Sequence, residues 1–285
     1  MAKLLAVCSL LAAHAAVSAA PGAAQLARGK YLMEGIAACA NCHGARDASG
    51  RVLAERGLSG GRLFDYPEFK SYASNITPDA QTGIGKWTDA QLGKAIREGV
   101  RPDGSIIGPP MPIEFYRNIS DDDLAAMIAY LRAQPAVANS VPKSQYVIAL
   151  PPSYGPPLSV VKSPPPSDRK RYGEYLSNVG HCMECHTPQG AGGRLDEKRF
   201  GAGGRAFDGP WGTSVSRNIT PHASGLKSWS DAQISTAVRQ GKNRSGAPYM
   251  PPMAFDWYRN ISDPDMAALT TYLRSLAPVP LAAKP

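Results

Sequence analysis

Two short stretches decide the fold of this chain: Cys39-Ala40-Asn41-Cys42-His43 and Cys182-Met183-Glu184-Cys185-His186. Each has two cysteines separated by two residues and followed directly by a histidine. The C-x-x-C-H pattern is the attachment sequence for c-type haem, in which both sulfurs bond the porphyrin and the histidine ligates iron. The sequence therefore predicts two covalently bound haems c. The attaching cysteines are Cys39, Cys42, Cys182 and Cys185, and the axial histidines are His43 and His186.

A C-x-x-C pair also occurs as a thioredoxin-like redox couple, half of a zinc site or a structural disulfide. A redox couple follows a strand in a βαβ unit, and no alternating strand pattern precedes either motif. A zinc site needs further ligands at short spacing, and neither motif has them nearby. Two copies in one chain favour haem over these alternatives.

The rest of the sequence is an internal repeat. Asn75-Ile76-Thr77-Pro78 returns as Asn218-Ile219-Thr220-Pro221, and 109–132 aligns with 251–274 without a gap. In that last alignment 15 of the 24 positions are identical, so the chain is a tandem duplication.

The second axial ligand of each iron follows from counting. After removal of a leader, His43 is the only histidine of the first half, so that site cannot have two histidines. The open alternatives are Met33, Met111, Met127, a lysine or an unfilled position. Both halves contain a Pro-Pro-Met loop, with Met111 lying 68 residues after His43 and Met253 lying 67 residues after His186. We therefore expect Met111 and Met253 to ligate iron, and His222 to lie at the surface.

Helix signals indicate the fold class. Short helices over 29–38 and 173–180 lead into the motifs, and Thr88 and Ser230 each begin a helix with glutamine three residues later, which is a capping box. Ser120 and Ser262 cap the last helices. These signals predict an all-α fold in two tandem domains, at 21–132 and 168–285, and with their C-x-x-C-H motifs and methionine loops both domains resemble class I cytochrome c domains. Between them, 133–167 contains nine prolines and predicts a semi-rigid linker packed on a domain, with disorder as the alternative.

The N-terminus resembles an export signal. Lys3 precedes an apolar run that ends in small residues, which predicts a cleaved signal peptide at 1–20 and a periplasmic protein. An uncut anchor or a lipoprotein acylated at Cys8 are the alternatives.

Hydrophobic residues make up 43% of the 285 residues, which excludes a disordered chain. The net charge is +8, but the basic residues form no continuous run, so we do not expect nucleic acid as a partner. The positive charge favours an acidic protein as a partner instead.

These motifs closely resemble the cytochrome c subunits of bacterial membrane-associated dehydrogenases acting on alcohols, aldehydes or gluconate. The resemblance rests on the Asn-Ile-Thr-Pro, Pro-Pro-Met and Tyr-Arg-Asn-Ile-Ser signatures and covers nearly all of 25–276. It implies His/Met ligation and single-electron transfer from a dehydrogenase toward an oxidase, a quinone-reactive protein or a small cytochrome. It also implies membrane association only through a partner. Subunits of this kind generally carry three haems, whereas this chain has two motifs.

An enzyme is the main alternative function, because dihaem peroxidases and thiosulfate dehydrogenases also contain two C-x-x-C-H motifs. Turnover at haem needs an open position on iron beside an acid or base. Two equivalent methionine loops give no such asymmetry, so we expect an electron-transfer protein and not an enzyme. A haem-storage protein is a third class.

Arg117 and Arg259, just after the methionine loops, are candidates for contacting haem carboxylates or for capping the next helix.

Overall fold

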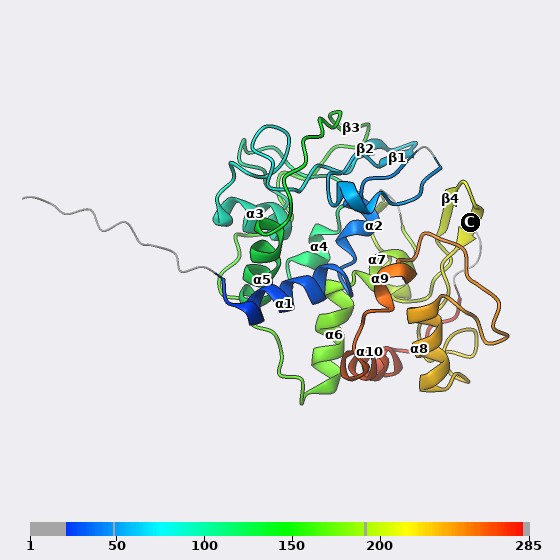
Figure 1. Cartoon of the computed structure of the whole chain (residues 1–285). Helices are drawn as coiled ribbons and strands as arrows, with labels where there is room; N and C mark the ends of the chain where they lie inside the picture. The colour runs from blue at the N-terminus through cyan, green and yellow to red at the C-terminus, as the bar shows by residue number, and fades with distance from the viewer. Residues whose placement is uncertain (1–20, 48, 191–192, 282–285) are drawn as a thin grey trace, which may run out of the picture.

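The computed structural model describes residues 21–47, 49–190 and 193–281 (Figure 1). The signal peptide predicted at 1–20 lies outside these residues. None of the helices in the described part is both long enough and apolar enough to cross a membrane. The first half contains α1 (Ala23–Met33), α2 (Cys39–His43), η1 (Ala54–Arg56), α3 (Asp89–Glu98), α4 (Ile113–Tyr116) and α5 (Asp121–Arg132). The second contains α6 (Arg169–Val179), α7 (Cys182–His186), η3 (Glu197–Arg199), α8 (Asp231–Gln240), α9 (Phe255–Tyr258) and α10 (Asp263–Ser275).

The predicted helix starts are confirmed where a polar cap was identified. The Thr88 side chain accepts from the backbone N–H of Gln91, and the Gln91 side chain accepts from the backbone N–H of Thr88. Ser230 and Gln233 make the same reciprocal box. Each box satisfies two backbone donors that the first helical turn leaves unpaired. The helix expected over 29–38 instead spans Ala23–Met33, which begins and ends earlier.

The expectation of an all-α fold is wrong. β1 (Leu63–Tyr66), β2 (Phe69–Tyr72) and β3 (Gln145–Tyr146) form an antiparallel sheet in the order β1-β2-β3. β4 (Ala206–Gly209) and β5 (Gly212–Val215) form a second antiparallel sheet. In the described residues the fold is therefore a mixture of helices and two small sheets.

The two hairpins are equivalent in the repeat, and their brevity explains why the sequence did not reveal them. Leu63 pairs with Tyr72 and Ala206 pairs with Val215, so each hairpin has four-residue strands joined by two residues that include a proline. Strands this short lack a readable alternation of apolar and polar side chains. Cross-strand hydrogen bonds therefore stabilise these strands, although the local sequence has no clear strand propensity.

The proline-rich segment lies against the first half. Its residues Gln145 and Tyr146 pair with β2, and the Tyr154 hydroxyl donates to the carbonyl of Ile107 at 2.8 Å. Arg117 donates to the carbonyl of Pro156 at 2.6 Å. These contacts anchor the segment at several points along its length.

Two helix pairs form the centre of the molecule: α1 packs on α5, and α6 packs on α10 (Figure 1). Each pair is closest at a glycine, because a Cβ on Gly29 would come within 2.0 Å of the Ala126 carbonyl oxygen. A Cβ on Gly173 would meet the Ala268 oxygen at the same distance. The core is continuous across the two halves, and it joins side chains such as Ile36 to Leu176 and Val179.

Candidate haem sites

The chain enters each C-x-x-C-H helix through a left-handed residue. Ala38, just before α2, has φ 46°, and His181, just before α7, has φ 40°. Residues with a Cβ seldom adopt this conformation, which costs about 1–2 kcal/mol. The same local turn therefore leads into both motifs, and no residue pattern in the sequence predicts it.

Both motif histidines are held by a backbone carbonyl. Nδ1 of His43 lies 2.8 Å from the Ser74 oxygen, and Nδ1 of His186 lies 2.7 Å from the Arg217 oxygen. With Nδ1 donating its proton to a carbonyl, Nε2 is the nitrogen left to ligate a metal. Burial lowers the pKa of each ring, which favours the neutral form that a metal ligand requires.

The four described cysteines form no disulfide. Burial raises the pKa of Cys39 to about 12 and the pKa of Cys182 to about 11. Burial also raises the pKa of Cys42, although Arg62 and Arg46 oppose it, and Glu184 adds to the effect of burial on Cys185. Reactive redox cysteines have lowered pKa values instead. These thiols therefore lack the lowered pKa that is typical of a thiol–disulfide redox pair.

Both motifs line one cavity of about 3050 Å³. Ligand pockets commonly have volumes of about 300–1,000 Å³, so this space suits two large groups. Repeated apolar side chains from the two halves wall it: Ile84 and Leu226, Trp87 and Trp229, Leu92 and Ile234, Ile96 and Val238. Such walls exclude water from a porphyrin face while the histidine and cysteines supply the bonds. The residues present thus fit haem c at both motifs.

The structure brings Met111 and Met253 to this cavity, together with the motif cysteines and histidines. Both methionines are half-buried against the core. The peptide bond between the two prolines that precede each methionine is cis in both loops. Met33 and Met127 also line the cavity, but each is only 2% exposed, and they belong with Met266, 3% exposed, to the helix core.

Other polar residues from the sequence are engaged elsewhere. Arg117 donates to the proline-rich segment, and Arg259 pairs with Asp256 at 3.0 Å on an exposed surface. Neither lines the cavity described above. His222 is bonded to Ser224 at 2.9 Å and lies near the surface.

Sequence reasoning missed three arginines at the motifs. Arg62 and Arg46 both donate to the carbonyl of Asn41, and Arg205 donates to the carbonyl of Glu184 at 2.9 Å. Arg62 and Arg205 are repeat equivalents that follow Gly-Gly, and this shared Gly-Gly-Arg was the available signal.

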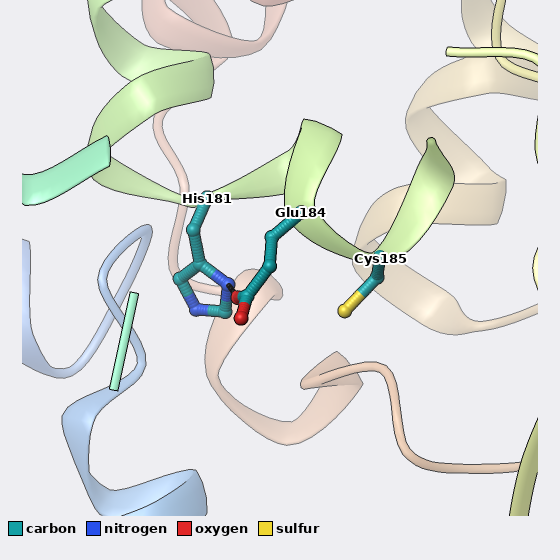
Figure 2. A group of neighbouring side chains, drawn as sticks. All are labelled: His181, Glu184 and Cys185. Carbon is teal, nitrogen blue, oxygen red and sulfur yellow. Dashed lines mark ion pairs between the residues drawn. The ribbon is translucent and has the colours of Figure 1, made fainter. Parts of the chain in front are cut away.

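His181, Glu184 and Cys185 offer ligand atoms within 4.8 Å of one another. Figure 2 shows the His181 ring and the Glu184 carboxylate pointing toward each other, with Cys185 on the following turn of the chain. The two polar groups lie 3.0 Å apart. Because Cys185 is part of the haem motif, we interpret this group as a polar contact between His181 and Glu184 beside the motif and not as a separate metal centre.

Comparison with known proteins agrees with this geometry. The cytochrome c family model matches twice, at residues 26–135 and 171–277. The chain is 32% identical over 303 residues to the alcohol dehydrogenase (quinone) cytochrome c subunit of Gluconobacter oxydans, covering 98% of this chain and 60% of the relative. It is 34% identical over 271 residues to the fructose dehydrogenase cytochrome subunit of Gluconobacter japonicus, covering 88% and 52% respectively. It is also 34% identical over 250 residues to a diheme cytochrome c-type protein of Cereibacter sphaeroides, covering 83% and 81%.

The chain belongs to the cytochrome c family. It carries two covalently bound haems c. It spans between half and two thirds of the length of the two dehydrogenase subunits named above.

Proposed function

We propose that this chain is an electron-transfer protein that accepts single electrons from a dehydrogenase and passes them to a respiratory acceptor. The observation that carries the proposal is the duplicated site, in which a C-x-x-C-H motif, a carbonyl-held histidine and a methionine loop line one cavity. The relatives named as cytochrome subunits of alcohol and fructose dehydrogenases support a dehydrogenase as the donor. An oxidase, a quinone-reactive protein or a small cytochrome would be the acceptor.

In this proposal each half holds one haem through its own residues. Cys39 and Cys42 would form the thioether bonds of the first site, and His43 and Met111 would ligate its iron. Cys182 and Cys185 do the same in the second site, with His186 and Met253 as ligands. Bound haem supplies an iron that changes by one electron between its ferric and ferrous states.

Residues of this chain would orient the iron ligands and prevent side reactions during electron transfer. The carbonyls of Ser74 and Arg217 fix the orientation of the ligating histidines. A thioether ligand from Met111 or Met253 would raise the reduction potential of the bound haem and would occupy the position on iron that peroxide needs. The same closure argues against the peroxidase and thiosulfate dehydrogenase alternatives.

We also propose that 21–132 and 168–285 are two cytochrome c domains joined by 133–167. The double family match supports this division. The continuous core implies that the two domains pack as one body. The export signal predicted at 1–20 supports a periplasmic location, with any membrane attachment made through a partner.

Stopped-flow oxidation tests the function. The fully reduced protein is mixed with an oxidised small cytochrome in one series and with hydrogen peroxide in the other. We expect rapid exchange with the cytochrome, which slows as salt screens the basic surface, and no sustained peroxide turnover. Rapid peroxide turnover, above all in protein with one haem reduced, would favour the peroxidase alternative instead.

A further inference from the structure

The first haem motif is flanked by two positive charges. Arg46 Nη2 donates to the Asn41 carbonyl oxygen at 3.0 Å, and Arg62 Nη1 donates to the same oxygen. Asn41 lies between the two attaching cysteines and is itself neutral. Both arginines line the cavity. Two guanidinium groups therefore converge on the segment between the two attaching cysteines, which we call the attachment edge of the site.

The second motif has a different balance of charge at the same place. Arg205 Nη1 donates to the Glu184 carbonyl oxygen at 2.9 Å, as Arg62 does in the first half. The position of Arg46 is occupied by Gln189, and both residues make the equivalent isolated bridge, Arg46 with Val52 and Gln189 with Leu195.

A carboxylate takes the place of the neutral amide at this second edge. Glu184 occupies the position of Asn41, and its carboxylate lies 3.0 Å from the His181 ring (Figure 2). One guanidinium and one carboxylate thus replace the two guanidiniums of the first site.

The aromatic contacts of Arg62 and Arg205 and the histidine–carbonyl bonds are duplicated between the two motifs. Arg62 lies over the Phe64 ring at 4.8 Å, and Arg205 lies over the Phe207 ring at 5.1 Å. The histidine–carbonyl bonds differ by only 0.1 Å, at 2.8 Å and 2.7 Å. One further cation of the second half, Arg217, is directed toward the Tyr249 ring, 5.7 Å away, beside the methionine loop. At the attachment edge itself, the two sites therefore differ by the replacements Arg46/Gln189 and Asn41/Glu184.

We propose that Arg46 and Glu184 set the order of the two reduction potentials, so that the haem at the first motif has the higher potential. This inference rests on the proposed function, because it assumes one haem at each motif. Reduction adds one electron to ferric iron and lowers its charge by one. Nearby cations stabilise the reduced state, whereas a nearby carboxylate stabilises the oxidised state. At equilibrium the first electron then resides at Cys39–His43 and the second at Cys182–His186.

The test exchanges the residues between the halves in the full haem-loaded chain. Arg46→Gln installs the residue of the second half, and Glu184→Asn installs the residue of the first. Both are followed by potentiometric titration, which resolves two one-electron midpoints. We expect Arg46→Gln to lower only the higher midpoint, and Glu184→Asn to raise the lower midpoint more than the higher one. Each substitution should change the equilibrium constant for one-electron reduction of the affected haem about tenfold, which shifts its midpoint potential by about 59 mV. Arg51→Gln is the matched control, because Arg51 is 75% exposed and pairs with Asp47 in the same loop. It should move neither midpoint.

The opposite pattern, with Arg46→Gln moving the lower midpoint, would overturn the proposed order. Haem staining of the denatured protein separates this failure from a failure of the proposed function. Retained haem with unmoved midpoints in both variants overturns only the role of these charges. Loss of covalent haem from the wild-type chain overturns the sites themselves. The two substitutions act on different motifs, so either one remains a test if the other prevents folding.

Discussion

The hydroxyl of Tyr31 donates a 2.6 Å hydrogen bond to the carboxylate of Asp265, 234 residues further along the chain. Its repeat equivalent, Tyr175, donates to Asp123 at the same distance. Each tyrosine lies in the helix that precedes one motif, and its side chain contacts the first turn of the last helix of the other half. The two halves are therefore joined by reciprocal contacts, as in a symmetric dimer whose subunits share one chain.

Removing one of these hydroxyls should destabilise the whole chain. Tyr31→Phe takes a donor from a carboxylate, and a hydrogen bond to a charged group contributes about 1.5–3 kcal/mol. We expect a loss near the lower end, about 1.5 kcal/mol, because Tyr31 is only half-buried. Guanidinium denaturation of the haem-loaded protein measures it. Tyr249→Phe is the control, because that ring stacks on Phe255 and should lose less than about 0.5 kcal/mol. Equal losses in the two variants would contradict the interpretation.

The same contact predicts a pH dependence. Burial and the bond to Asp265 raise the pKa of Tyr31 to about 12. In the unfolded chain tyrosine has a pKa of about 10, so its contribution is complete below that pH. It is lost as pH rises toward about 12, because the unfolded state releases its proton first. The stability difference between wild type and Tyr31→Phe should shrink across this interval in denaturation curves. A difference that stays constant would argue that the hydroxyl is not linked to folding.

The methionine loops should close the axial position at each haem. Met111→Ala and Met253→Ala remove the proposed ligand but not the cysteines, so haem should remain attached and bind carbon monoxide or cyanide. Visible spectra with and without carbon monoxide provide the measurement. Met250→Ala is the matched control, since Met250 is 47% exposed and its repeat equivalent is Gly108. A ligand-free spectrum unchanged by Met111→Ala and Met253→Ala would reject His/Met ligation.

The glycine crossings should tolerate no side chain. Gly173→Ala places a Cβ within 2.0 Å of the Ala268 oxygen, and backbone atoms of α10 have little room to move. Overpacking of this kind costs about 3 kcal/mol or more. Gly22→Ala, where a Cβ meets nothing within 4 Å, is the control and should be close to neutral. Thermal unfolding of both variants distinguishes the two cases, and similar melting temperatures would contradict a tight crossing between α6 and α10.

Features that depend on neighbouring residues were predictable from the sequence. The two haems follow from the C-x-x-C-H spacing, because attachment needs two sulfurs and an adjacent histidine in one short segment. The repeat was visible in the alignment of 109–132 with 251–274, and the family in the signatures that the two halves share. The helix starts at Thr88 and Ser230 were equally legible, since a capping box is complete within four residues. The ligand roles of Met111 and Met253 are still predictions that the shared cavity supports.

Tertiary structure decided the features that join distant segments. The hairpins, which made the all-α expectation wrong, depend on pairing between short strands without a strong pattern of their own. The contact between Tyr31 and Asp265 and the convergence of Arg46 and Arg62 on one carbonyl likewise leave no local signature. Sequence spacing determined which groups can bond haem, because that chemistry is local. Tertiary structure determined that Arg62 and Arg205 lie beside the motifs, because electrostatic interactions depend on distance in space and not along the chain.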